Sequence, residues 1–286
     1  MKIAIIGLGL IGGSLAKAAK RNTSHTILGY DSQPSVMLRA KMLQAIDGEA
    51  DASQYPSVDM VIIALYPGAA IETLSSIADA LKPGTIVMDT CGTKSAVCSR
   101  MQEICRAHGL AFIGGHPMAG IERSGFDAAV DTLFNQASMI MVPDPQIDIN
   151  LLESAKKFFM DLGFGTVKLT TPAEHDRIIA YTSQLAHIAA SSYIKSPTAL
   201  EHSGFSAGSF RDMTRVATLH EGMWTELCLD NREDLLQELQ RYIDNLNAFR
   251  EAIANADARQ LQELFKQGRE IKAKVDALPK TPYSIF

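Results

Sequence analysis

A glycine-rich turn directly after the first apolar run constrains the fold of this chain more than any other feature. Residues 2–7 read KIAIIG, and GLGLIGGS follows from position 7. In the G-x-G-x-x-G pattern the first glycine permits a tight turn, and the second lets a pyrophosphate approach the backbone. The third lets the following helix pack closely on the strand. The pattern therefore predicts a dinucleotide site at the start of a helix, formed by Gly7, Leu8, Gly9, Leu10, Ile11 and Gly12.

An aspartate ends the second apolar run, HTILGYD. This residue, Asp31, follows the third glycine of the pattern by 19 positions. A carboxylate at that point is placed to accept hydrogen bonds from the adenosine ribose. It also repels a 2′-phosphate, and the adjoining DSQPSV contains no arginine to bind one. We therefore expect NAD as the cofactor rather than NADP, and treat an ordinary surface aspartate beside a glycine turn as the alternative.

Short apolar runs alternate with helical stretches through the first half of the chain. After the first two, the runs are MVIIAL, GTIVMDT, AFIGG and MIMVP, and GTVKLT follows later. Apolar runs without alternation are typical of strands that are covered on both faces. Helical patterns over 11–21, 68–82, 94–108 and 150–162 separate them. The sequence thus predicts an α/β domain of Rossmann type, with a mainly parallel sheet, over residues 1–171.

The second half shows helical patterns only. Thr171, Pro172 and Glu174 form a capping box, which predicts a helix from there to about Lys195. Two later apolar stripes predict a pair of long helices, an αα-hairpin. The stripes are Leu239, Tyr242, Leu246, Phe249 and Ile253, then Leu261, Leu264, Phe265, Ile271, Val275 and Leu278. Their apolar surface suits a bundle core or a dimer seam, and residues 172–286 are predicted to form an all-α domain.

Composition excludes several classes of function. The formal net charge of −5 argues against a nucleic-acid or anionic-membrane partner. The four cysteines form no C-x-x-C pair and show no metal-ligand spacing, so no metal site is expected, and a reducing cytoplasm fits them. We see no signal peptide and no apolar run of membrane-spanning length.

One histidine lies in a segment of small residues after the fifth strand-like run. His116 is the centre of GGHPMAG, and histidine is the side chain whose proton moves near neutral pH. In an open parallel sheet, ligands bind outside the carboxyl ends of the strands. The segment DTCGTK, at 89–94, ends the preceding strand at the same edge. Both segments are expected to face one nicotinamide ring, although a buried histidine bound to the backbone is the structural alternative.

The helical half contains a second group of candidate residues. In GSFRDMTRVA, Asp212 and Arg215 lie three positions apart and can share a helix face. The pair suits either a surface salt bridge or an arginine that binds a carboxylate with two hydrogen bonds, and the spacing does not choose between them. His187, in SQLAHIAA, suits either a packed histidine or a residue of a cleft.

Four segments in this order resemble the prephenate dehydrogenases, the TyrA family: GLGLIGGSLA, GGHPMAGIERSG, SQLAH and FRDMTRVA…MW. The resemblance implies a Rossmann-type domain joined to a helical domain that forms a homodimer. It implies NAD-dependent oxidative decarboxylation of prephenate to 4-hydroxyphenylpyruvate in tyrosine biosynthesis, or of arogenate in some branches. It also implies that His116 contacts the ring hydroxyl, Arg215 holds a substrate carboxylate and His187 lines the pocket. Glu122 and Gly208 are further substrate-binding residues on the same resemblance.

The chain departs from its relatives at two places. Many relatives have a serine, a partner of the catalytic histidine, where this chain has Gly92, so Thr93 is expected to supply the hydroxyl, with Thr90 as the alternative. Relatives often carry a second histidine where Gln184 stands. The chain ends at PKTPYSIF without a regulatory domain of the ACT type or a fused chorismate mutase, so we expect a monofunctional enzyme.

The chemistry of prephenate gives His116 a role as the base that accepts the hydroxyl proton. Its small neighbours are expected to admit both the substrate ring and the nicotinamide, and an unperturbed pKa near ~6.5 suits this task. Two other readings remain. A β-hydroxyacid dehydrogenase places a lysine on the helix that enters the second domain, whereas this helix has no lysine before Lys195. A nucleotide-binding sensor needs neither a base nor an arginine in one cleft.

Overall fold

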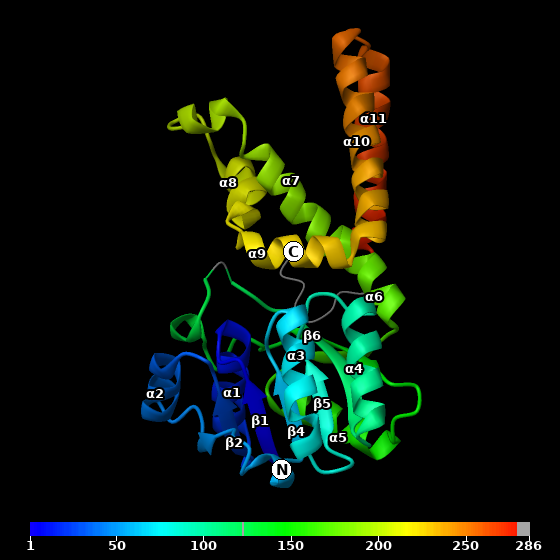
Figure 1. Cartoon of the computed structure of the whole chain (residues 1–286). Helices are drawn as coiled ribbons and strands as arrows, with labels where there is room; N and C mark the ends of the chain where they lie inside the picture. Colours follow the sequence, from blue (N-terminus) through cyan, green and yellow to red (C-terminus); the bar gives the residue numbers. More distant parts are fainter. Residues whose placement is uncertain (122, 279–286) are drawn as a thin grey trace. The chain divides into compact units, whose positions relative to one another are not determined.

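The computed structural model describes residues 1–121 and 123–278, and the chain forms two compact units (Figure 1). The first comprises Met1–Asp176 and Thr218–Asp230, and the second comprises Arg177–Ala217 and the chain from Asn231 onward. The sequence placed the boundary between residues 171 and 172. It assigned residues 218–230 to the helical domain, whereas the structure packs this segment with the first unit.

The first unit is built on an eight-stranded sheet with the order β3-β2-β1-β4-β5-β6-β7-β8. All neighbouring strands are parallel except β6 and β7, which confirms the mainly parallel sheet that the apolar runs predict. The two-residue edge strand β3 was not predicted, since so short a strand carries no pattern. The strands are β1 (Lys2–Ile6), β2 (Thr26–Tyr30), β3 (Gly48–Glu49), β4 (Met60–Ile63), β5 (Ile86–Asp89), β6 (Ala111–Pro117), β7 (Ser138–Pro143) and β8 (Thr166–Leu169).

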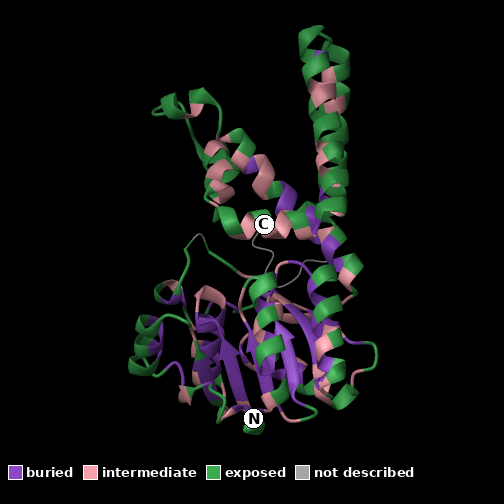
Figure 2. Ribbon diagram, viewed as in Figure 1, coloured by how far each residue is buried: buried purple, intermediate pink, exposed green. Residues whose placement is uncertain are grey.

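Helices cover both faces of this sheet, which explains why its strands are apolar throughout. In β1, Ile3 and Ile5 belong to one core cluster, and Ala4 and Ile6 belong to the other. Helices α1 (Leu10–Asn22), α2 (Pro34–Met42) and α5 (Ile149–Asp161) contribute to the first cluster. Helices α3 (Pro67–Ile77) and α4 (Ser95–Ala107) contribute to the second. Figure 2 shows the central strands as the most continuously buried part of this unit.

Strand order places a crevice where the chain changes direction across the sheet. From β1 the chain builds outward to β2 and β3, and then returns to add β4 on the other side of β1. Ligands in such sheets bind at this switch point, outside the carboxyl ends of the strands. The glycine turn, Asp89 and His116 all follow or end strands at that edge. Helix α9 (Glu221–Asp230) contacts the same edge, because Glu226 Oε1 accepts a hydrogen bond from Gly68 N at 2.7 Å.

The second unit is entirely helical among its described residues. The helix predicted from Pro172 to about Lys195 is present as α6 (Pro172–Ile179), a π-helical segment (Ala180–Leu185) and α7 (Ala186–Tyr193). Thr171 Oγ1 accepts from Glu174 N at 3.2 Å, as the capping motif predicts. The short α8 (Gly208–Thr214) leads into a 3₁₀ turn, Arg215–Ala217.

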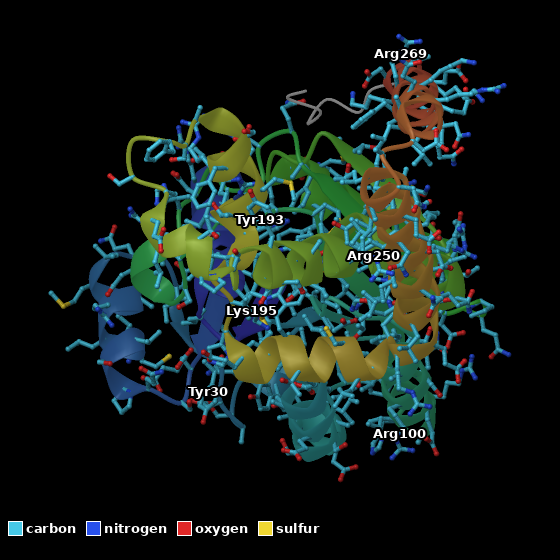
Figure 3. All side chains as sticks on the ribbon, turned by 90° about the horizontal axis from the view of Figure 1, so that it is seen from above. Tyr30, Arg100, Tyr193, Lys195, Arg250 and Arg269 are labelled. Carbon is cyan, nitrogen blue, oxygen red and sulfur yellow. The ribbon has the colours of Figure 1, made fainter. Side chains whose placement is uncertain are left out.

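The predicted αα-hairpin is present as α10 (Arg232–Ala254) and α11 (Ala258–Asp276). Asp257 begins the second helix, and its side chain accepts a hydrogen bond from Gln260 N at 2.9 Å. Helix α10 buries only Leu235 and Ala252, and α11 buries no residue. Figure 3 labels Arg250 of α10 and Arg269 of α11 among the many side chains that project from these two helices. Much of the apolar stripe, including Leu246, is therefore left uncovered by residues 1–121 and 123–278, so these residues do not bury it in a bundle core.

The described part of the chain contains neither a membrane-spanning helix nor a cluster of metal-ligating side chains. Within residues 1–121 and 123–278, no helix is long and apolar enough to cross a membrane. The same residues contain no group of three or more His, Cys, Asp or Glu side chains placed to hold a metal ion.

Candidate active site

The glycine turn shows why its three glycines are required. Gly7 has a φ of +89°, and a Cβ there would lie 2.5 Å from the carbonyl oxygen of Ala64. A Cβ on Gly12 would lie 1.9 Å from the carbonyl oxygen of Gly7, so strand and helix pack too closely for any side chain. A Cβ on Gly9 would meet no protein atom within 4 Å, and Gly9 caps α1 without a side-chain hydrogen bond. The turn thus leaves open space at a helix N-terminus, where a phosphate binds well.

Asp31 is fixed beside this turn. Its Oδ2 accepts from Leu8 N at 2.9 Å, and its Oδ1 accepts from Gln33 N at 2.9 Å. Tyr30, labelled in Figure 3, closes β2 directly before it and is 47% exposed. The backbone N–H of Leu8 therefore donates to Asp31, and the Leu8 side chain lies in the hydrophobic core. The residues present fit a dinucleotide, with the open Gly9 for the pyrophosphate and the Asp31 carboxylate for the ribose.

The turn after β5 is held by a fully buried ion pair. Lys94 Nζ contacts Asp89 Oδ2, and both side chains have no exposed surface. Burial disfavours the ammonium form, but the Asp89 carboxylate outweighs it and raises the pKa of Lys94. Asp89 also accepts hydrogen bonds from Cys91 N at 2.9 Å and from Gly115 N at 3.2 Å. The pair thus ties the turn to β6 at the residue that precedes His116.

Three side chains of the first unit form a hydrogen-bonded chain. His116 Nδ1 lies 2.8 Å from His175 Nε2, and His175 Nδ1 lies 2.7 Å from Asp176 Oδ1. Asp176 accepts from Lys94 N at 2.8 Å and from Ser95 N at 2.7 Å, at the start of α4. The predicted site residue is thus linked to a buried carboxylate through a second imidazole.

The environment favours a neutral imidazole at His116. Burial, the neighbouring His175 and the Lys94 ammonium lower its pKa well below the usual value, and Asp176 opposes them. The expectation of an unperturbed pKa near ~6.5 was therefore wrong, since the sequence does not show these neighbours. Burial opposes ionisation of Asp176, but hydrogen bonds from His175, Ser95 and the Lys94 amide prevail and lower its pKa. His175 thus lies between the neutral imidazole of His116 and the anionic carboxylate of Asp176.

The glycines before His116 have a different role from the one that the sequence suggested. A Cβ on Gly114 would lie 2.6 Å from Cys98 Sγ, and a Cβ on Gly115 would lie 2.4 Å from the carbonyl oxygen of Asp89. Both glycines are buried and allow β6 to pack against α4 and β5. They do not admit a substrate ring or a nicotinamide. Only Gly120 of this segment is open, because a Cβ there would meet no atom within 4 Å.

The hydroxyl that we expected beside His116 is directed elsewhere. Thr93 is buried, and its Oγ1 donates to Asp230 Oδ2 of α9 at 3.3 Å. A Cβ on Gly92 would lie 3.2 Å from Leu227 Cδ2 of the same helix. The turn therefore packs on α9. Thr93, which was expected to supply a hydroxyl partner for the catalytic histidine, is bonded to Asp230, and His175 is the partner at His116 Nδ1.

The substrate residues suggested by the helical half all belong to the second unit, so their position relative to His116 is not described. His187 is half-buried, and its Nδ1 lies 2.8 Å from the carbonyl oxygen of Ser183. Gly208 begins α8, and Arg215 begins the 3₁₀ turn that follows it. Asp212 pairs with its neighbour Arg211 at 3.7 Å, in an exposed contact. Glu122 lies outside the described residues.

Gln184, which stands where relatives often have a histidine, is buried in the second unit. Its Oε1 accepts from Asn231 Nδ2 at 2.8 Å. The amide therefore joins the π-helical segment to the start of α10, which is a structural contact.

Sequence reasoning missed His175 and Asp176. It used Thr171 and Glu174 as a capping motif and assigned nothing to the EHD letters beside them. Adjacent histidine and aspartate in the first turn of a helix were the available signal. Their partner lies 59 positions earlier in the chain, and no local pattern joins the two segments.

Comparisons with known proteins agree with this architecture. Residues 15–168 match the family model for the prephenate dehydrogenase nucleotide-binding domain, and residues 171–267 match that for its dimerization domain. Cyclohexadienyl dehydrogenase of Zymomonas mobilis is 33% identical over 279 residues, which cover 94% of this chain and 94% of that protein.

Solved structures of similar proteins span nearly the whole chain. Arogenate dehydrogenase of Synechocystis has a TM-score of 0.80 at 29% identity, covering 96% of this chain and 100% of that one. Prephenate dehydrogenase from A. aeolicus, in complex with hydroxyphenyl propionate and NAD⁺, has a TM-score of 0.82 at 27% identity, covering 98% and 99%. With two matching domains and a relative above 30% identity over most of its length, this chain belongs to the prephenate dehydrogenase family.

Proposed function

We propose that the protein is an NAD-dependent prephenate dehydrogenase of tyrosine biosynthesis, with His116 as the base. The observation that carries this proposal is the hydrogen-bonded His116–His175–Asp176 chain, with His116 half-buried and the other two buried, at the sheet edge that also holds the glycine turn. A neutral imidazole is the form that accepts a proton, and its environment favours that form.

The reaction requires three balanced changes. The carbinol carbon loses a hydride, the hydroxyl loses its proton, and the ring loses its carboxylate as carbon dioxide. The electrons of the broken carbon–carbon bond enter the ring and bring negative charge to its oxygen, which takes a proton back to become the phenol of 4-hydroxyphenylpyruvate. NAD, when bound at the glycine turn, supplies the hydride acceptor. In this proposal His116 takes the hydroxyl proton, and the buried surroundings keep its imidazole available as a base.

Arogenate is the second candidate substrate, because the similar Synechocystis structure is an arogenate dehydrogenase. NADH formation with prephenate, arogenate and a β-hydroxyacid, measured in parallel, tests the proposal. Turnover with prephenate at the highest kcat/KM is expected. A clear preference for arogenate or for the hydroxyacid would overturn the proposed substrate, and no turnover with any of them would favour a nucleotide-binding sensor.

We also propose a homodimer formed through the second unit. The matched family domain is described as a dimerization domain, and α10 and α11 leave a stripe of apolar side chains exposed. These side chains are Ile243, Leu246, Ile253, Phe265, Ile271 and Val275. A second copy of the same surface would remove this stripe from water.

Asp31 is expected to set the choice of cofactor. In the proposed complex its carboxylate accepts hydrogen bonds from the ribose and repels a 2′-phosphate. The wild-type protein should use NAD far better than NADP. Asp31→Ala should lower kcat/KM for NAD by about 10-fold or more, and so reduce the difference in kcat/KM between the two cofactors. The measurement is kcat/KM with each cofactor. Asp131→Ala, which removes an exposed carboxylate paired with Arg21, is the matched control. A wild-type preference for NADP would contradict the prediction.

Arg215 is proposed to bind a substrate carboxylate, with His187, Gly208 and Glu122 also at the substrate. Arg215→Lys loses the planar two-hydrogen-bond geometry, which should cost about 1.5–3 kcal/mol, or about 10–150-fold in KM for prephenate. KM for NAD should not change. Arg211→Lys alters a side chain that is 79% exposed and is the control. An unchanged prephenate KM in a folded Arg215→Lys protein would leave Arg215 a purely structural role.

A further inference from the structure

Two backbone N–H groups, which can only donate, hold Asp176 as an acceptor. The backbone N–H groups of Lys94 and Ser95 point to its two oxygens, at 2.8 and 2.7 Å. They precede and begin the 13-residue helix α4, whose N-terminal end stabilises a negative charge. A further partner is His175 Nδ1, 2.7 Å from Oδ1. A carboxylate cannot donate, so His175 Nδ1 must carry a hydrogen.

This requirement passes along the chain of hydrogen bonds. A neutral imidazole carries one hydrogen, so His175 Nε2 presents a lone pair when its Nδ1 is protonated. His116 Nδ1 lies 2.8 Å away from that lone pair, and two lone pairs do not form a hydrogen bond. His116 Nδ1 must therefore donate. The other nitrogen of this ring, Nε2, is then the one with the free electron pair.

We propose that His175 and Asp176 are positioning residues that fix the tautomer of His116, so that its Nε2 faces the substrate as a base. This inference rests on the proposed role of His116. It also accounts for the missing serine: Gly92 offers no hydroxyl, the Thr93 hydroxyl is bonded to Asp230, and His175 holds the ring nitrogen instead.

The same hydrogen-bonded side chains stabilise the positive charge that develops on His116 during the reaction. As the substrate O–H bond breaks, the proton forms an N–H bond at Nε2 of His116, and the ring becomes positive. Its Nδ1–H then donates to His175, whose own Nδ1–H donates to the Asp176 carboxylate. The other charged groups nearby, Lys94 and Asp89, are paired with each other, so Asp176 is the carboxylate that opposes the new charge.

Asp176→Asn separates this role from simple packing, because an amide has nearly the same shape but one end that donates. If the amide nitrogen faces His175, the hydrogen of His175 moves to Nε2, and His116 Nδ1 becomes the acceptor. His116 then carries its hydrogen on Nε2, toward the substrate. The expected loss in kcat is about 10²–10⁴-fold, with KM for NAD unchanged.

The tautomer is measured directly by long-range ¹H–¹⁵N NMR of protein labelled with ¹⁵N-histidine, assigned with His116→Asn. Wild-type His116 is expected to be protonated on Nδ1, and the Asp176→Asn protein on Nε2. Asp79→Asn is the matched control, since Asp79 contacts His108 Nε2 at 3.1 Å, in an exposed pair. A wild-type His116 protonated on Nε2 would overturn the proposal.

A second pair of variants covers the case in which Asp176→Asn does not fold. His175→Gln keeps an acceptor for His116 Nδ1, whereas His175→Phe does not, so the Gln protein should retain the higher kcat and the Nδ1–H tautomer. Equal rates in the two variants would contradict the role of His175. The NMR measurement needs no substrate. The expected tautomer in a protein that turns over neither prephenate nor arogenate would therefore contradict the proposed function and leave this inference standing.

Discussion

Replacing His116 with asparagine is expected to lower kcat for prephenate by about 10²–10⁴-fold, the usual contribution of general-base catalysis. Asparagine can still hydrogen-bond the substrate hydroxyl, so KM for prephenate should change much less. NAD binding should be nearly unaffected, since the glycine turn and Asp31 are untouched. The measurements are kcat, both KM values and the melting temperature of one preparation. His108→Asn, at a half-buried surface position of the same unit, is the control.

The pH dependence gives a second test of the same residue. The protonated form of His116 is inactive as a base, and its pKa lies well below the usual value. The acid limb of wild-type kcat/KM should therefore lie below ~6.5, the pKa of an unperturbed histidine. As pH falls through ~6.5, the unfolded chain binds a proton at this residue before the folded chain does, so stability should fall with pH in that window.

His116→Asn should remove both effects. A stable variant that keeps its rate and its acid limb would show that another group is the base. A large fall in melting temperature, with little loss of kcat in the protein that remains folded, would favour a packing role for this histidine.

Breaking the Asp89–Lys94 pair is expected to have the largest effect on stability. Both side chains are fully buried, and Asp89→Asn leaves the Lys94 ammonium without its counter-charge. Removing one partner of a buried pair costs about 3–5 kcal/mol. For a chain of this size, each kcal/mol of lost stability lowers the melting temperature by roughly 2–4 °C, so the melting temperature should fall by about 6–20 °C. The control is Glu103→Gln, which breaks the exposed Arg100–Glu103 pair of α4 and should cost less than about 1 kcal/mol.

The double variant Asp89→Asn with Lys94→Met distinguishes an unpaired charge from loss of shape. It removes the ammonium as well, so it should recover much of the stability lost in Asp89→Asn. The Lys94 ammonium also helps to lower the pKa of His116, so the acid limb of activity should move to higher pH. A double variant as unstable as the single one would show that the carboxylate acts through its contacts with Cys91 and Gly115 instead.

Much of the fold was predictable because its signals are local. A strand covered on both faces needs apolar residues at every position, and a helix with one buried face needs them at a period of 3.6 residues. These patterns gave β1, β2 and β4 to β8, the helix that begins after Thr171, and the αα-hairpin. They did not give the two-residue β3, which is too short to show a period. The reversed direction of β7 and the packing of residues 218–230 with the first unit depend on long-range contacts.

The candidate site likewise contains residues that local sequence signals predict and residues that only long-range contacts identify. Gly7, Gly9, Gly12 and Asp31 are proposed from sequence alone, because in a dinucleotide-binding βαβ unit the glycine turn and the acidic residue keep a fixed spacing. His116 was identified by its predicted position after a strand, whereas the structure places it within β6, one residue before the end of that strand. Its partner was not identified, because Thr93 lies near Gly92 in the sequence, whereas its hydroxyl is bonded to Asp230.

The sequence by itself determined most of the segments that form strands and helices, where a dinucleotide site is proposed and which histidine is the candidate base. Only the tertiary structure decided the chemical state of that histidine. Hydrogen bonding and charge act through space over a few ångströms, and the groups that act on His116 come from positions 94, 175 and 176. Folding brings these positions together through contacts between β6, α4 and the start of α6, and no spacing along the chain records their distance.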